Sequence, residues 1–372
     1  MKIVFTTDQV YLHGGIEKVM ATKANYFADV LGYEVYVITT EQKGNKPCYS
    51  FSEKVKFIDL EINYIRTKSY FSRFNLKKIP QHFLKWSKAI KKINPDFIIV
   101  CNLAFDYYWT PFFYRKINKI KEFHASRFYS SIERKKKKGM RKLPFIINDF
   151  IESKYDVLVL LNKDEEQFYN SNNLIVIPNP INTTNQKTAD LVNLKAIAAG
   201  RIAPVKGFEK AIAVWKIVVS ECPEWKLDIF GQGETDYIEG LQMLIRKNNL
   251  QHNVFIHDAV SDLHERMLDY SFYLMTSKTE CFPMILLEAM SLGLPLLSFD
   301  CPYGPRNIIT NKKDGFLVED QNVTRLAESC INIISDLDLR CKMGHQAKEN
   351  VVVFGVANVM QRWIDLFHFM SK

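Results

Sequence analysis

Long apolar runs are missing from this sequence. No stretch of about 18 uncharged apolar residues occurs, so we expect no membrane-spanning helix. We also expect no secretory leader, because Met1–Thr7 has the pattern of a first strand and no apolar leader core follows it. The seven cysteines are an odd number without a Cys-x-x-Cys pair, which argues against a disulfide framework. We therefore expect reduced, mostly buried thiols in a cytoplasmic protein.

The composition also lacks extremes. Hydrophobic residues make up 47% of the chain and charged residues 24%, which are ordinary values for a folded protein. They exclude a disordered or fibrous chain. With 372 residues, the chain is long enough for two domains of common size.

Positive charge is abundant and unevenly distributed. The formal net charge is +9. Residues 1–183 carry 30 basic and 18 acidic side chains, whereas residues 184–372 carry 20 and 23. Seven basic residues fall within nine positions, and they are Arg134, Lys135, Lys136, Lys137, Lys138, Arg141 and Lys142. A function for this chain should account for an excess of cations confined to one half.

Short strand patterns alternate with helical patterns along the whole chain, in two series. A polar linker at residues 182–190 separates them. Alternation of strand and helix predicts parallel sheets covered on both faces. We therefore predict an α/β fold with two Rossmann-like, doubly wound domains facing across a cleft. The predicted domains are residues 1–183 and 184–355, and a helix at 356–372 is expected to pack back on the first domain.

Ligands of such sheets bind at the carboxyl ends of strands, so candidate site residues should lie in the loops that follow strands. After the first strand, Gly14 and Gly15 precede a helix, where backbone N–H groups can approach an anion. An ordinary turn is the alternative interpretation. After the strand at 194–199, Gly200 leaves room while Arg201 and Lys206 bring two cations to one helix N-terminus. That arrangement suits a diphosphate, and a solvated pair of cations on a loop is the alternative.

Two carboxylates bracket a helix after the strand at 271–275. Glu280 precedes the helix and Glu288 lies about two turns along it, while Pro283 fits the first turn. The backbone N–H groups of Cys281 and Phe282 can then face a ligand. Glu288 lies between apolar neighbours, which favours contact with a hydroxyl-rich ligand; the alternative is a carboxylate turned to solvent.

These motifs together resemble glycosyltransferase family 4. The pattern consists of Gly-Arg-x(4)-Lys-Gly at 200–207, Gly-x-Gly-Glu at 231–234 and Glu-x(7)-Glu at 280–288. The Gly-Gly loop, the Ile-Pro-Asn-Pro linker and the segment 313–318 also match, so the resemblance covers nearly the whole chain. The family contains retaining transferases with two Rossmann domains, known as the GT-B type. The segment 303–306 is similar to members that use UDP-sugars for surface polysaccharides such as capsule or lipopolysaccharide.

The resemblance implies roles for individual residues. Arg201 and Lys206 would hold the donor diphosphate, and Glu288 the ribose hydroxyls. Glu280 and the backbone of Cys281 and Phe282 would bind the donor sugar. Gly14 and Gly15 would lie beside the phosphates, and His124 would lie near the sugar. Gly200 and Gly231 would form the loops near the donor. For His124, the alternative is a histidine without a role in the reaction.

No cofactor or metal is expected besides the nucleotide-sugar substrate. The one Asp-x-Asp motif is Asp336–Asp338, far from every strand-end loop, and we interpret it as a solvated turn. Two cations with helix N-termini can replace a divalent ion at a leaving diphosphate. No clear pair of carboxylates suggests a covalent intermediate. The family-based expectation is therefore a same-face attack, in which the leaving phosphate accepts the proton of the acceptor hydroxyl.

The basic segment 134–142 points to the acceptor. It lies between a strand end and a predicted helix at 143–151, and a mobile solvated loop is the alternative to a functional segment. Cations near acidic lipids contribute roughly 1 kcal/mol each to membrane binding. We expect peripheral docking on the cytosolic face of the inner membrane and a glycan acceptor linked to polyprenyl diphosphate.

Two other functions remain open at this point. A UDP-sugar 2-epimerase would share the fold, need no acceptor and release free sugar. A basic nucleic-acid-binding protein is the non-enzymatic alternative, although no nucleic-acid-binding module occurs in the sequence and we expect no nucleic-acid partner.

Overall fold

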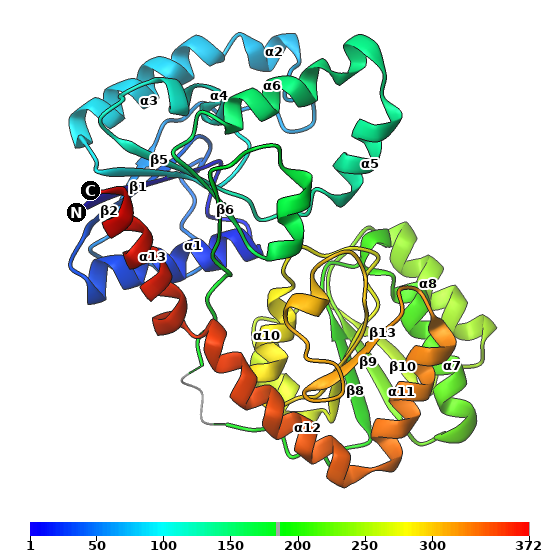
Figure 1. Cartoon of the computed structure of the whole chain (residues 1–372). Helices are drawn as coiled ribbons and strands as arrows, with labels where there is room; N and C mark the ends of the chain where they lie inside the picture. The colour runs from blue at the N-terminus through cyan, green and yellow to red at the C-terminus, as the bar shows by residue number, and fades with distance from the viewer. Residues whose placement is uncertain (184–186, 372) are drawn as a thin grey trace. The chain divides into compact units, whose positions relative to one another are not determined.

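The computed structural model describes residues 1–183 and 187–371, which form two α/β units (Figure 1). The first unit comprises Met1–Pro180 and Val359–Lys372, and the second comprises Ile181–Asn358. The predicted fold class of two doubly wound parallel-sheet domains is confirmed. The predicted start of the second domain, residue 184, and the predicted last residue of the terminal helix, 372, lie outside the described residues.

Seven parallel strands form the sheet of the first unit, in the order β3-β2-β1-β4-β5-β6-β7. Most of its strands are short apolar runs because helices cover both faces; β5 differs, with Lys119, Lys121 and Glu122 buried. Val4 of β1 lies opposite Tyr36 of β2 on one side and Ile98 of β4 on the other, so the strand order reverses between β1 and β4. The strands are β1 (Lys2–Thr7), β2 (Glu34–Thr39), β3 (Lys56–Asp59), β4 (Phe97–Val100), β5 (Asn118–Glu122), β6 (Val157–Leu160) and β7 (Leu174–Val176).

Helices cover this sheet with apolar side chains. Trp86 and Ile90, on the long helix of the unit, are completely buried in one cluster with Val4 and Ile98 of the sheet. The helices are α1 (Gly15–Asn25), α2 (Arg73–Leu76), α3 (Ile79–Ile93), α4 (Asp106–Trp109), α5 (Phe128–Lys136) and α6 (Leu143–Glu152).

The basic segment is mostly helical, which argues against the alternative of a solvated loop. Residues 134–136 form the last turn of α5, and Gly139–Lys142 form a 3-10 turn that leads into α6. Lysine and arginine are good helix formers. Glu133 also lies near Lys136 and Lys137 at the next turn, with N–O distances of 3.5 and 3.9 Å. These local preferences extend the helix into the charge cluster.

Six parallel strands form the second sheet, in the order β10-β9-β8-β11-β12-β13. Its core contains Trp215, whose ring lies 6.2 Å from that of Phe272. The strands are β8 (Lys195–Ala199), β9 (Lys226–Phe230), β10 (Val254–His257), β11 (Phe272–Met275), β12 (Leu296–Phe299) and β13 (Gly315–Val318). The helices are α7 (Phe208–Glu221), α8 (Thr235–Lys247), α9 (Leu263–Arg266), α10 (Met284–Ser291), α11 (Val323–Ser335) and α12 (Leu337–Asn350).

The last helix, α13 (Val356–Met370), carries the chain back to the first unit. The ring of Phe367 lies 5.3 Å from that of Phe27 and 4.4 Å from that of Phe97, between centroids. Lys23 Nζ lies 4.6 Å from the ring centroid of Trp363. The end of the chain therefore completes the core around its beginning, as Figure 1 shows with the red helix beside the blue α1.

The remaining expectations concern cysteines, membrane spans and the Asp-x-Asp motif. All seven cysteines are free thiols, and five of them are buried. Among the described residues, no helix combines the length and hydropathy needed to cross a bilayer. Asp336 is the N-cap of α12, where its Oδ1 accepts a hydrogen bond from Leu339 N at 2.8 Å. This cap explains why an aspartate stands there.

Candidate active site

The loops after β8 and β11 lie side by side in the second unit. These two strands are neighbours at the point where the strand order reverses, with Phe272 of β11 opposite Ala196 of β8. Doubly wound sheets bind their ligands at this point, beyond the carboxyl ends of the strands. The predicted donor residues follow these two strands, namely Gly200, Arg201 and Lys206 after β8 and Glu280, Cys281 and Phe282 after β11.

Lys206 and Glu280 are in contact across the two loops. Lys206 Nζ lies 2.6 Å from Glu280 Oε1, and Ser277 Oγ donates a hydrogen bond to the same oxygen at 2.7 Å. Both side chains line a small hollow with Ala199 and Thr276. Only 24% of the Lys206 side chain and 13% of the Glu280 side chain are exposed. Charges so shielded from water act more strongly on a bound ligand than charges on an open surface.

Backbone contacts hold the two loops together. Lys278 N donates a hydrogen bond to Val205 O at 2.8 Å, and Thr276 Oγ1 donates one to Gly207 O at 3.0 Å. Gly207 has a φ of 64°, and a Cβ at this position would lie 2.3 Å from Thr276 O. Glycine is therefore required for the close approach of the start of α7 to the β11 loop.

The glycine turn after β9 supports the same site from the side. Gly231 lies so close to the β8 loop that a Cβ would be 1.9 Å from Gly200 O. Next to it, Ile202 N donates a hydrogen bond to Gln232 O at 2.7 Å. These glycines let three neighbouring strand-end loops approach one another.

The other predicted donor residues of the second unit lie near Lys206 or Glu280 in the sequence. Arg201 is exposed and makes no ion pair with any described residue. Cys281 and Phe282 are buried, and Glu288 is half-buried within α10. Pro283 is the N-cap of this helix, so its prediction as a first-turn residue is wrong by one position. Its ψ of 98° is extended, and helical backbone begins only at Met284.

In the first unit, Gly15 begins α1 and Gly14 is its N-cap. The helix N-terminus faces a carboxylate of its own chain, because a Cβ on Gly14 would lie 2.3 Å from Glu17 Oε2. Gln9 Nε2 donates a hydrogen bond to Glu17 Oε1 at 2.8 Å. Burial raises the pKa of the Glu17 carboxyl, against the effect of these hydrogen bonds.

His124 follows β5 by two residues and has 6% of its side chain exposed. Neither ring nitrogen has a hydrogen-bond partner among the described residues, and Nε2 lies 3.5 Å from Glu122 Oε2. Glu122 is itself buried and paired with Lys23. Burial alone would raise the pKa of the Glu122 carboxyl, but Lys23 and His124 outweigh it and hold the pKa below its ordinary value. Buried polar groups are normally satisfied, so His124 has hydrogen-bonding capacity to offer a ligand.

A second polar cluster lies at the carboxyl ends of β1 and β2. Arg66 Nη2 lies 3.3 Å from Asp8 Oδ2 and 2.5 Å from Glu41 Oε1. Burial raises the pKa of the Asp8 carboxyl to about 6; Arg66 opposes this shift, and Glu41 and Asp106 add to it. Sequence reasoning missed this cluster because its members come from separate loops.

Sequence reasoning also missed a group around Asp228 on β9. His257 Nε2 lies 2.6 Å from Asp228 Oδ1, and Tyr270 OH donates a hydrogen bond to Asp228 Oδ2 at 3.0 Å. The imidazole stacks on Phe230, with 4.6 Å between ring centroids. The available signal was a single acidic residue inside an apolar strand, which requires a buried partner.

The described residues contain no group of three His, Cys, Asp or Glu side chains arranged to hold a metal ion. The chemistry that the donor side offers is electrostatic. Lys206 and the exposed Arg201 provide positive charge beside the start of α7, and Glu280 provides an acceptor for hydroxyl groups. Such an arrangement stabilises a leaving group on which negative charge develops.

Comparisons with known proteins agree with this arrangement. Residues 183–350 match the family of glycosyl transferases group 1. An uncharacterized glycosyltransferase of Haemophilus influenzae is 26% identical over 370 residues, which cover 97% of this chain and 98% of that protein. The poly(ribitol-phosphate) alpha-N-acetylglucosaminyltransferase of Staphylococcus aureus is 27% identical over 169 residues. That match covers 45% of this chain and 34% of the relative's length.

Among solved structures, S. aureus TarM in complex with fondaparinux, alpha-GlcNAc-glycerol and UDP has a TM-score of 0.77. The match covers 98% of this chain and 99% of that chain at 16% identity, so it concerns the fold. The two parallel sheets thus have the fold of the GT-B class. Residues 183–350, nearly the whole second unit, thus match the group 1 glycosyltransferases, and the chain is similar along nearly its full length to a glycosyltransferase. The resemblance drawn from the sequence motifs is confirmed.

Proposed function

We propose that this enzyme transfers a hexosyl group from a UDP-sugar to a hydroxyl of a glycan acceptor, with retention of the anomeric configuration. The observation that carries the proposal is the contact between Lys206 and Glu280 at the reversal point of the second sheet. A cation suited to a diphosphate thus lies next to a carboxylate suited to sugar hydroxyls. The comparison with TarM, which was crystallised with UDP, supports a uridine nucleotide.

The proposed roles follow from position and charge. Lys206 and Arg201 neutralise the diphosphate as it leaves, and the backbone beside Gly200 and Gly207 leaves room for it. Glu280, already bonded to Lys206 and Ser277, accepts hydrogen bonds from sugar hydroxyls and is not a free nucleophile. Glu288 is assigned to the ribose hydroxyls.

The first unit provides the acceptor side of this proposal. His124, whose Nδ1 has no hydrogen-bond partner among the described residues, binds a hydroxyl near the transferred sugar. Gly14 and Gly15 are assigned to contacts with the donor phosphates. Attack on the same face, with proton transfer to the leaving phosphate, requires no second carboxylate.

Incubation of the purified enzyme with a panel of UDP-hexoses, with and without glycan acceptors, tests the donor assignment. We expect acceptor-dependent release of UDP, which Lys206→Ala and Glu288→Ala should both impair. Release of a free epimerised sugar without an acceptor would identify a 2-epimerase instead. Near-normal turnover in both variants would refute the assignment of the site.

We further propose that the acceptor is lipid-linked and that the enzyme docks on an anionic membrane surface. Four apolar side chains of α6 share one face and are between 44% and 56% exposed, and they are Leu143, Ile146, Ile147 and Phe150. An exposed apolar helix face beside a basic segment is typical of helices that lie in the membrane interface. Vesicle flotation with and without phosphatidylglycerol tests this docking. Absence of binding to both kinds of vesicle would reject it.

A further inference from the structure

Two adjoining hollows lie between α5, α6 and the loop before β7 in the first unit. The first has a volume of about 240 Å³ and the second about 260 Å³. They share Ser131, Arg134 and Phe168 as lining residues. Neither hollow includes any residue of the donor site, so they need an explanation of their own.

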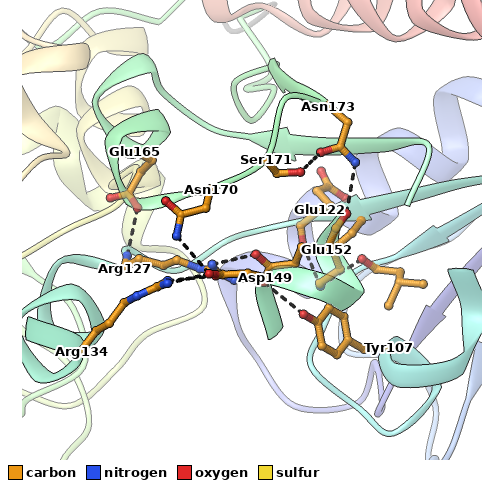
Figure 2. A network of polar contacts seen from close by, with 12 residues as sticks. Tyr107, Glu122, Arg127, Arg134, Asp149, Glu152, Glu165, Asn170, Ser171 and Asn173 are labelled. Atoms are coloured by element: carbon orange, nitrogen blue, oxygen red, sulfur yellow. Dashed lines mark hydrogen bonds and ion pairs between the residues drawn. The ribbon is translucent and has the colours of Figure 1, made fainter. Parts of the chain in front are cut away.

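Ion pairs hold the wall of the first hollow in place (Figure 2). Arg127 Nη1 donates a hydrogen bond to Glu152 Oε2 at 2.9 Å, and Arg127 N donates one to Glu165 Oε2 at 2.9 Å. Tyr107 OH donates a hydrogen bond to Glu152 Oε1 at 3.0 Å. Because Glu152 is buried, these contacts fix the guanidinium of Arg127 at the hollow and neutralise its charge.

A second arginine separates the two hollows. Arg134 donates hydrogen bonds to both carboxylate oxygens of Asp149, at 2.9 Å from Nη1 and 2.6 Å from Nη2. Asn170 Nδ2 donates a third hydrogen bond to Asp149 Oδ2 at 3.0 Å. Figure 2 shows Arg134, Asp149 and Asn170 converging from three different segments. Hydrogen bonds between three segments therefore hold Arg134 in place between the two hollows.

The second hollow carries positive charge that no carboxylate neutralises. Lys135 and Lys142 line it and make no ion pair with any described residue, whereas Lys136 and Lys137 both lie near Glu133. Gln167 and Asn170 line the same hollow, and each amide NH2 has a second N–H besides the one donated to Asp164 O or to Asp149 Oδ2. Ammonium groups together with amide donors are groups that bind phosphoryl oxygens.

The first hollow has a different character. Its lining combines the aromatic rings of Phe123, Phe145 and Phe168 with the polar groups of Ser126 and Asn148. A mainly apolar lining with a few polar side chains is common in small-molecule sites, and a sugar ring presents both kinds of surface.

We infer that the two hollows form one acceptor site, in which the second hollow binds a phosphoryl group and the first binds the sugar attached to it. This inference rests on the proposed glycosyl transfer and specifies the class of acceptor. Lys142 directly precedes Leu143, the first residue of the exposed apolar face of α6. That adjacency assigns the phosphoryl group to a lipid whose chain lies in the membrane next to α6.

The test compares two double variants within the same basic segment. Lys135→Ala/Lys142→Ala removes the cations of the second hollow, and Lys136→Ala/Lys138→Ala removes two that do not line it. A control, Lys91→Ala/Lys92→Ala, removes two exposed lysines at the end of α3. Binding is measured to phosphatidylcholine vesicles containing farnesyl diphosphate, and separately to vesicles containing phosphatidylglycerol.

On farnesyl diphosphate vesicles, we expect at least tenfold weaker binding for Lys135→Ala/Lys142→Ala and less than threefold change for Lys136→Ala/Lys138→Ala. The α3 control should match the wild-type protein. On phosphatidylglycerol vesicles the two basic-segment variants should weaken binding to a similar extent, because only total charge matters there. If both basic-segment variants lost the same amount of binding to farnesyl diphosphate vesicles, the inference would be overturned. The hollow would then contribute nothing beyond the charge of the surface.

Two further measurements test whether the phosphoryl group belongs to a lipid and whether the first hollow binds a sugar. Inorganic diphosphate should compete only weakly with the lipid, and equally tight binding of the soluble ion would refute the lipid assignment. Asn148→Ala should raise the KM for a saccharide acceptor without changing the KM for the UDP-sugar; an unchanged acceptor KM would refute the sugar site. Failure of the proposed function itself would appear separately, as absent turnover of UDP-sugars by the wild-type enzyme.

Discussion

Lys206 Nζ and Glu280 Oε1 lie 2.6 Å apart although 74 residues separate them in the sequence. The contact joins the loop after β8 to the loop after β11. Each residue therefore positions the other, because the carboxylate of Glu280 holds the ammonium group of Lys206 in place. Loss of either side chain should alter both halves of the donor site.

Replacement of Lys206 tests the importance of this cation for transfer. We expect Lys206→Ala to lower kcat about 100- to 1,000-fold, the usual effect of losing one contact that stabilises charge in the transition state. Lys216→Ala, an exposed lysine on α7, should behave as the wild type. Steady-state UDP release measures both. A tenfold or smaller change for Lys206→Ala would show that other groups neutralise the diphosphate.

Replacement of Gly231 tests the close packing of the strand-end loops. A Cβ at this position would lie 1.9 Å from Gly200 O, so Gly231→Ala should destabilise the second unit by several kcal/mol, about 2–4, and impair donor binding. Gly240 within α8 has no atom within 4 Å of its Cβ position, and Gly240→Ala should stabilise by about 0.5–1 kcal/mol. Thermal unfolding of both variants gives the comparison. Equal melting temperatures would contradict the steric argument.

Replacement of Asp8 tests a pH dependence of stability. The folded pKa of about 6 exceeds the ordinary value of 3.8, so the folded state binds this proton more tightly than the unfolded state. The free energy of unfolding of the wild type should therefore fall as the pH rises from 3.8 through 6. Asp8→Asn removes this pH dependence. The free energy of unfolding of the variant should exceed that of the wild type by up to about 3 kcal/mol at pH 7.5, but by little at pH 4. Urea unfolding at both pH values measures it, and a pH-independent difference would contradict the prediction.

Replacement of Phe367 tests the terminal helix as part of the first core. Phe367 is completely buried against Phe27 and Phe97, so Phe367→Ala should destabilise the first unit by about 3–5 kcal/mol. Phe369, two residues later, is 72% exposed, and its replacement by alanine should change stability by less than 0.5 kcal/mol. Chemical unfolding gives the free energy of unfolding of both variants for comparison. Similar effects would mean that α13 only rests on the surface.

The donor side was predictable from the sequence because its signals are local. Gly200, Lys206 and Gly207 follow one another within a single strand–turn–helix segment, and Glu280 stands at the corresponding place after β11. The rule that ligands bind beyond strand ends then brings these loops together. The contact between Lys206 and Glu280 was not predictable, since strand order had to be known first.

The polar networks of the first unit escaped prediction because their partners are distant in sequence. Lys23 and Glu122 are 99 residues apart, and Tyr107 and Glu152 are 45 apart. A charged residue inside an apolar strand indicates that a partner exists but not which one it is. The helical state of the basic segment was not predicted either, because dense charge is also typical of a solvated loop, whereas here the helix preference of the lysines and Glu133 prevailed.

The return of α13 to the first unit also determines when that unit can fold during synthesis. Phe27 and Phe97 emerge early from the ribosome, but Trp363 and Phe367 follow only after the whole second unit. Domains ordinarily fold in order from the N-terminus. Here the second unit is complete in sequence before the first, so the N-terminal half must wait for the last turns of the chain to close its core.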